Sequence, residues 1–280
     1  MTKLNKKLIF DVGLHKGEDT DFYLSKGFNV VAFEANPDLV TSCKVKFKKE
    51  IEDNKLKIVE GAIAEDNFEK KIKFFRNKKN SVWGTVIKEW AERNEMDGAF
   101  SECIEVNSID IREYYQKYGI PYYLKIDIEG MDLVCCRALL EFNDKPSYIS
   151  IESDKISFSN LEKEFELFDQ LGYEKFKIIQ QDGISNQKEK NPSNENKFLN
   201  YKFSEGASGV FGDDLPGIWL NKKEALKKYK KIFSFYKVFG DNSFLRKFLP
   251  TKIIIKLFRR LTGIPLPGWY DTHSKHKSVH

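Results

Sequence analysis

Short apolar runs alternate with helix-like segments along the first two thirds of the chain. Runs typical of buried strands lie at 8–12, 28–33, 56–59, 122–128, 148–151 and 173–179, with less regular ones at 71–75 and 103–106. Segments with helical spacing lie at 18–26, from 37 onward, and at 109–118, 131–140 and 161–171. This βα alternation predicts an α/β fold with a mostly parallel sheet and helices on both of its faces.

The rest of the chain is less regular. Residues 186–197 are polar apart from one proline, which predicts a mobile loop. Residues 222–237 have helical spacing again, and residues 243–270 contain no acid. Within the latter, Ile253, Leu257 and Leu261 recur every four residues between basic side chains, which predicts a basic amphipathic helix. We therefore expect one α/β domain at 1–220 and a helical, basic C-terminal extension at 221–280.

In the first two strand-like segments, the apolar residues 8–10 and 30–33 are each followed by an acid, Asp11 and Glu34, and a turn from Gly13 to Gly17 follows the first segment. In an open parallel sheet, ligands bind beyond the carboxyl ends of the strands. The turn leads into a helix N-terminus, which favours an anionic group. An acid at the end of the second strand can accept hydrogen bonds from both hydroxyls of a ribose. The pattern therefore indicates a nucleoside with a short charged tail.

A dinucleotide and S-adenosylmethionine both fit this outline. The dinucleotide turn is G-x-G-x-x-G, whose second glycine lets the backbone approach a pyrophosphate. Here His15 occupies the place of that second glycine. A bulky side chain at this position argues against a pyrophosphate, and the G-x-x-x-G turn favours the smaller methionine moiety. A nicotinamide-dependent oxidoreductase on a Rossmann-like fold is kept as an alternative.

A second group of acids follows the later strands. Asp127 and Glu129 lie two residues apart, so they share one face of a strand, and Glu152 ends the neighbouring strand. Carboxylates there can act as a general base or hold Mg²⁺, for which Asp127 and Glu152 are the candidates. Asp127 and Glu129 could instead cap the helix that follows. His273, in "WYDTHSK", is another candidate base, and it fits an ordinary tail residue equally well.

The stretches "DVGLHKGEDTDFYLSKGFNVVAFEANP", "YLKIDIEGMD" and "YISIE" resemble the FkbM-type S-adenosylmethionine-dependent methyltransferases, and "SGVFGDDLPG" and "GWYDTHSK" are similar to segments in part of that family. The resemblance implies a class I methyltransferase fold, a doubly wound Rossmann-like sheet of about seven strands. It also implies methylation of a hydroxyl on a sugar, glycan or secondary metabolite. The cofactor-binding residues expected on this basis are Asp11, Gly13, His15, Gly17, Thr20, Glu34, Ala35, Ala62 and Asp127. The expected catalytic residues are Asp127, Glu129 and His273.

Composition limits the partners and the cellular location that we expect for the protein. The net charge of +5 over 280 residues is mild and does not demand nucleic acid as a partner. The four cysteines form no C-x-x-C pair, residues 1–7 are polar, and no apolar run approaches ~20 residues, so we expect a cytoplasmic protein. The basic helix adds the expectation of contact with an anionic membrane surface, and a membrane- or polymer-binding protein is a further alternative function.

The C-terminal extension also leads to an expectation about truncation. Because it follows the last apolar run of the predicted sheet, we expect it to cover the acceptor side of the site. On this interpretation, a chain that ends near Gly240 still binds S-adenosylhomocysteine but no longer transfers a methyl group.

Overall fold

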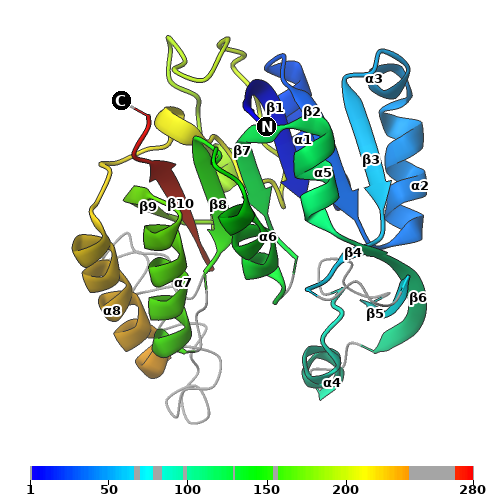
Figure 1. The fold of residues 1–280 in the computed structure, drawn as a ribbon. Helices are drawn as coiled ribbons and strands as arrows, with labels where there is room; N and C mark the ends of the chain where they lie inside the picture. Colours follow the sequence, from blue (N-terminus) through cyan, green and yellow to red (C-terminus); the bar gives the residue numbers. More distant parts are fainter. Residues whose placement is uncertain are drawn as a thin grey trace.

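The computed structural model describes residues 2–65, 70–77, 84–96, 100–128, 130–153, 157–239 and 269–279. Within these residues, a seven-stranded sheet forms the centre of the molecule and helices cover both of its faces (Figure 1). Its strands, in spatial order, are β3 (Leu56–Glu60), β2 (Asn29–Glu34), β1 (Leu4–Val12), β7 (Ile120–Ile126), β8 (Tyr148–Glu152), β10 (Tyr270–His276) and β9 (Tyr173–Gln180). A second, three-stranded sheet is ordered β4 (Ala62–Ile63), β6 (Ser101–Ile109) and β5 (Lys71–Asn77).

Helices of different parts of the chain cover the two faces. One face packs against α5 (Ile111–Tyr118), α6 (Asp132–Ala138), α7 (Phe158–Gln170) and α8 (Lys222–Phe239). The other packs against α1 (Glu18–Ser25), α2 (Pro37–Lys46) and the segment from 184 to 215. Two further helices are α3 (Lys48–Glu52) and α4 (Lys88–Met96). Within the large sheet β1, β2, β3, β7 and β8 are parallel, which confirms the predicted doubly wound, mostly parallel fold.

The local sequence explains the helix that follows β2. Asn36 is the N-cap of α2, and its side-chain oxygen accepts a hydrogen bond from the Asp38 N–H at 3.1 Å. Pro37 occupies the first helical position, where its missing N–H costs nothing. The chain therefore turns sharply at the end of β2, and Glu34 is left at the edge of the sheet.

The last strand corrects the predicted domain boundary. β10, dark red in Figure 1, lies between β8 and β9 and is antiparallel to both. Thr272 and Ser274 are fully buried, so residues 270–276 are part of the sheet rather than of a cover over it. The Tyr229 and Thr272 hydroxyls lie 2.6 Å apart, which ties α8 to the same core. The predicted boundary at 220 therefore separates no independent unit.

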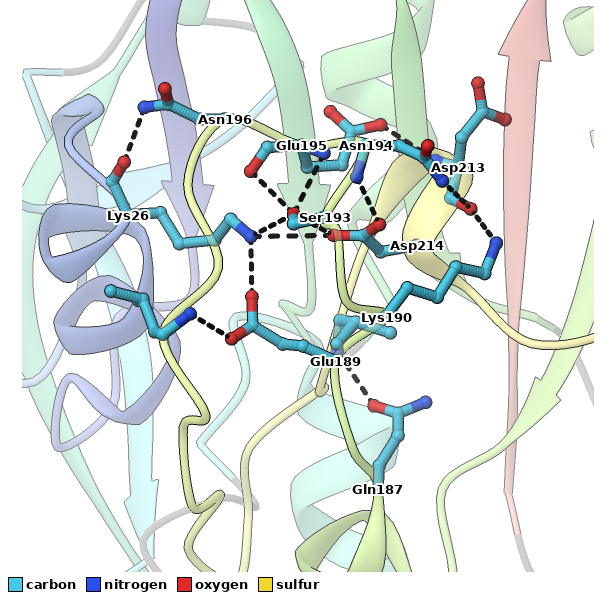
Figure 2. A network of polar contacts seen from close by, with 12 residues as sticks. Lys26, Gln187, Glu189, Lys190, Ser193, Asn194, Glu195, Asn196, Asp213 and Asp214 are labelled. Carbon is cyan, nitrogen blue, oxygen red and sulfur yellow. Dashed lines mark hydrogen bonds and ion pairs between the residues drawn. The ribbon is translucent and has the colours of Figure 1, made fainter.

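The polar segment 186–197 is held in place by buried contacts, whereas a mobile loop was predicted. Figure 2 shows Glu189, Ser193 and Asn196 of this segment around Lys26, whose ammonium lies 2.6 Å from the Glu189 carboxylate and 2.7 Å from the Ser193 hydroxyl. Glu195 is 2% exposed and accepts hydrogen bonds from the Tyr122 hydroxyl and the Asp213 N–H, both at 2.8 Å. The prediction of a mobile loop is wrong, because these polar groups satisfy one another inside the protein.

The predicted basic amphipathic helix around 253–261 lies outside the described residues, so membrane contact through it stays a prediction. In the part of the chain that the structure describes, no helix combines the length and the apolar character that crossing a membrane requires.

Candidate functional site

A cavity lies at the carboxyl ends of β1, β2 and β7, where the strand order reverses, as expected for a ligand site in an open sheet. Six of the predicted cofactor-binding residues line it, namely Gly13, His15, Glu34, Ala35, Ala62 and Asp127. The other lining residues are Val12, Phe33, Gly61, Ile63, Phe74, Gly84, Thr85, Val86, Ile128 and Met131. The charged or titratable lining residues His15, Glu34 and Asp127 are among these six.

The glycine turn after β1 is fixed by close backbone contacts. Gly13 has a φ of +94°, and a Cβ placed on it would lie 2.1 Å from the Asp127 carbonyl oxygen. Only glycine fits this approach between the turn and the end of β7. His15 also has a positive φ, +50°, and its ring Nδ1 lies 3.2 Å from a Glu18 carboxylate oxygen. The histidine thus helps to shape the turn.

Glu34 closes the turn from the neighbouring strand. Its carboxylate accepts hydrogen bonds from the N–H groups of His15 and Asn36, both at 2.8 Å. Burial raises the pKa of the Glu34 carboxyl, and the two N–H bonds act in the opposite direction. An ionised carboxylate has about four acceptor positions, so Glu34 retains capacity for two hydroxyls of a ligand in the cavity.

Three of the predicted cofactor-binding residues lie behind the cavity wall instead of lining it. Asp11 is fully buried and accepts a hydrogen bond from the Thr20 hydroxyl at 2.6 Å. Burial raises the pKa of Asp11, although the Lys125 ammonium at 3.4 Å acts against this. Gly17 faces the ring of Phe47, which a Cβ at this position would approach to 2.3 Å. These residues therefore support the turn from the protein interior.

The apolar half of the cavity was not predicted. Phe74 comes from β5 of the small sheet. Gly84, Thr85 and Val86 lie next to it in the cavity wall, because Thr85 pairs with the backbone of Phe75. Residues 76–100 lack a clear period, so no sequence signal placed them near β2. Together with Ile63, Phe74 and Val86 form an apolar wall of the kind that ligand sites present to a planar base.

A row of carboxylates continues from the cavity across the sheet. Asp127 lines the cavity, and its side chain is half exposed. Ile126 on β7 pairs with Ile151 on β8, so the next residues, Asp127 and Glu152, lie side by side. Asp271 on β10 pairs with Glu152. Burial raises the pKa of Asp271 well above its usual range, and the charges of Asp127 and Glu152 add to this. The sequence reasoning missed Asp271, because β10 was not recognised as a strand.

The alternative role of Asp127 as a helix cap is not observed. The N-cap residue of α6 is Met131, and the Asp132 carboxylate accepts the N–H groups of Ile128 at 3.2 Å and Gly130 at 3.3 Å. Glu129, the other predicted catalytic acid, lies outside the described residues. Among the residues with described positions, no group of three or more His, Cys, Asp or Glu side chains is arranged to hold a metal ion. The expectation of Mg²⁺ at Asp127 and Glu152 therefore gains no support.

His273 is not placed as a catalytic base. It lies in the middle of β10, opposite Ser150 on β8 and Lys177 on β9, and is 2% exposed. Neither of its ring nitrogens has a hydrogen-bond partner among the described residues. Burial, with a smaller contribution from Lys177, lowers the pKa of His273 to about 3. The prediction of a catalytic or tail residue is corrected to a neutral core residue, because the imidazole is sealed inside the sheet.

This burial predicts an acid-sensitive fold. Below the ordinary histidine pKa of ~6.5, the unfolded chain binds a proton at His273 that the folded chain does not, so stability falls by about 1.4 kcal/mol per pH unit. His273→Leu removes that contribution. Urea denaturation at pH 7.5 and pH 4.5 should show that the variant loses about 3 kcal/mol less stability than the parent over this interval. Equal losses in the two proteins would mean that His273 does not titrate in this way.

The chain matches one family model and is similar to several solved structures. The family model described as the methyltransferase FkbM domain matches residues 11–175, more than half of the chain. Solved structures similar to the chain include a precorrin-6y C5,15-methyltransferase from Geobacter metallireducens GS-15 (14% identity, 63% of this chain and 68% of that chain covered, TM-score 0.35). Another is an S-adenosylmethionine-dependent methyltransferase from Archaeoglobus fulgidus (12% identity, 97% and 86% covered, TM-score 0.36). No curated protein matches the chain.

Because these sequence identities and TM-scores are low, the family of the chain is assigned from the family match and from the fold of the chain itself. The family match begins at Asp11 and spans the glycine turn, Glu34 and Asp127, which are the residues around the cavity. The sheet is the seven-stranded, mostly parallel sheet expected of a class I methyltransferase. The chain belongs to the FkbM methyltransferase family.

Proposed function

We propose that the protein transfers a methyl group from S-adenosylmethionine to a hydroxyl of a sugar, glycan or similar metabolite. The observation that supports this most strongly is the position of Asp127, which lines the cofactor cavity and begins the row of carboxylates that continues through Glu152 to Asp271. Carboxylates accept hydrogen bonds from hydroxyls and repel anions, so Asp127 and Glu152 suit a hydroxyl-bearing acceptor better than an anionic one.

The residues of the cavity suit S-adenosylmethionine. Glu34 has acceptor positions for the two ribose hydroxyls, and Phe74, Val86 and Ile63 offer an apolar wall for the adenine. Gly13, which has no side chain, lines the cavity on the side where the short polar chain of the cofactor would lie. When bound, the cofactor supplies an activated methyl group on its sulfonium.

The protein's own contribution concerns the acceptor hydroxyl. An alcohol is a poor nucleophile and must lose its proton near the moment of attack. Asp127 is the carboxylate that both lines the cavity and remains half exposed, so it is our candidate for the general base. Trp269, 52% exposed, precedes Asp271 by two residues and offers an aromatic surface beside the same end of β10.

The experiment uses S-adenosylmethionine with a labelled methyl group and a matched set of glycosides. Each set presents the same sugar with a free hydroxyl, with that position deoxygenated, with an amine, or with a carboxylate. The expected product is a methyl ether that survives mild base, formed only from the hydroxyl compound. Label transferred to the amine, or into a base-labile methyl ester, would contradict O-methylation while leaving methyl transfer itself intact.

Replacing Glu34 should weaken cofactor binding. Hydrogen bonds to a charged group contribute about 1.5–3 kcal/mol, so Glu34→Ala is expected to reduce affinity for S-adenosylhomocysteine at least tenfold, since ~1.4 kcal/mol corresponds to a factor of ten. Glu60→Ala is the matched control, because Glu60 pairs with Glu34 across the sheet and ion-pairs with Lys44 at the surface. Calorimetric titration that gives both variants the parent affinity would remove Glu34 from the site.

Replacing Asp127 should affect turnover more than folding. Asp127→Asn keeps the size of the side chain but removes its basicity, so we expect the parent melting temperature and a loss of activity of about 100-fold or more. Asp53→Asn, an exposed aspartate at the end of α3, serves as the control. Parent-like activity of Asp127→Asn on the accepted glycoside would show that another group takes the proton. Loss of activity with EDTA and recovery with Mg²⁺ would favour a metal instead.

A further inference from the structure

Lys125 lies on β7 directly behind the cavity wall and is 4% exposed. Its ammonium donates a hydrogen bond to the Gly13 carbonyl oxygen at 3.0 Å. The same nitrogen lies 3.4 Å from Asp11, 3.7 Å from Asp19 and 3.8 Å from Asp127. One cation therefore contacts the glycine turn, two buried carboxylates and the exposed carboxylate of the cavity.

These contacts lie at the joint between β1 and β7, by which we mean the place where the carboxyl ends of these two adjacent strands meet. On one side of the joint the Gly13 backbone lies against the Asp127 carbonyl, and the Asp127 N–H donates to the Val12 carbonyl at 2.9 Å. On the interior side the Lys125 ammonium bridges Gly13 and Asp127. Both of these residues line the cavity, whereas Lys125 does not.

Neutralising the surrounding carboxylates does not by itself explain why a lysine is buried at position 125. Three carboxylates around one ammonium leave surplus negative charge, and Asp11 Oδ1 has no hydrogen bond among the described residues. Replacing buried ion pairs by apolar groups of similar volume is often neutral for stability. The contacts of Lys125 to the two cavity residues are therefore the better account of its position.

We propose that Lys125 is a positioning residue, which holds the Gly13 turn and the Asp127 carboxylate in a fixed relation so that the cavity wall is preformed for the cofactor. The inference rests on the proposed function, because it takes the cavity to be the S-adenosylmethionine site. Lys125 acts through Gly13 and Asp127, and preorganisation of this kind raises affinity by reducing the ordering that binding requires.

The experiment compares two buried lysines on the same face of the sheet. Lys177 on β9 is 4% exposed and donates to the Leu215 carbonyl at 2.7 Å, but it does not line the cavity or contact its residues. Lys177→Met therefore loses a buried amine–carbonyl bond of the same kind. For Lys125 we use the double variant Lys125→Met/Asp11→Asn, which removes one positive and one negative buried charge together.

Affinity for S-adenosylhomocysteine is measured by calorimetry, with melting curves to confirm folding. We expect the double variant to bind at least tenfold more weakly than the parent, and Lys177→Met to bind within twofold of it. Parent-like affinity in a folded double variant would overturn the role of Lys125 and leave the proposed function intact. A parent that does not bind the ligand would overturn both.

If the double variant does not fold, Lys125→Arg tests the same point. A planar guanidinium cannot reproduce the contacts of a compact ammonium to four oxygens, so the arginine variant should bind S-adenosylhomocysteine several-fold more weakly at parent-like stability. Unchanged affinity in Lys125→Arg would then count against the positioning role.

Discussion

A chain that ends at residue 239 is expected to show no cooperative unfolding transition and no binding of S-adenosylhomocysteine. The truncation removes β10, which pairs with β8 on one side and β9 on the other. Without it, β8 becomes an unpaired edge, β9 at the end of the sheet loses its partner strand, and the Tyr229 hydroxyl loses its partner on Thr272. The expectation from sequence, that such a chain keeps its cofactor site, is therefore reversed.

Circular dichroism melts and calorimetry test this prediction. The control is a chain that ends at Lys277, which retains all of β10 and should melt within a few degrees of the parent. A second arm adds a synthetic peptide of residues 266–280 to the truncated chain, and partial recovery of binding is expected. Cooperative melting with intact binding in the chain that ends at residue 239 would mean that the sheet does not need β10.

The second large effect concerns Lys26. Its side chain is fully buried and lies 2.6 Å from the Glu189 carboxylate and 3.5 Å from that of Asp214, both themselves buried (Figure 2). Lys26→Met leaves two buried carboxylates without their cation. Breaking a buried pair in this way typically costs 3–5 kcal/mol, so we expect a loss of about that size in the free energy of unfolding.

Urea denaturation measures this loss, with Lys44→Met as the matched control. Lys44 pairs with Glu60 at 3.1 Å, but both side chains are about half exposed. Such surface pairs contribute about 0–1 kcal/mol, so the control should change stability little. Adding Glu189→Gln to Lys26→Met should recover part of the loss. A loss for Lys26→Met no larger than that for Lys44→Met would show that the segment from 187 to 214 is held by other contacts.

The sequence predicted those parts of the molecule whose local pattern agrees with their place in the fold. β1, β2, β7 and β8 are buried apolar strands, so their hydrophobic runs were readable. Glu34 was identified because a carboxylate directly after such a run must lie at the edge of the sheet. The glycine turn was readable for a related reason, since its positive φ angles favour glycine.

The parts that were missed depend on partners far away in the chain. β10 consists of polar and charged residues, and only its neighbours β8 and β9, 90 or more residues earlier, make it a buried strand. His273 and Asp271 were misjudged or overlooked for that reason. The segment from 186 to 197 is polar in composition, yet Lys26, some 160 residues earlier, provides the charge that lets Glu189 be buried. No local pattern reports such pairings.

The central claim is that the cavity at the ends of β1, β2 and β7 binds S-adenosylmethionine. Calorimetric titration of the full chain with S-adenosylhomocysteine, and separately with NADH, tests it most directly. We predict one molecule of S-adenosylhomocysteine per chain, displaced by S-adenosylmethionine and weakened at least tenfold by Glu34→Ala, with no heat from NADH. Binding of NADH without binding of S-adenosylhomocysteine would contradict the account and favour an oxidoreductase.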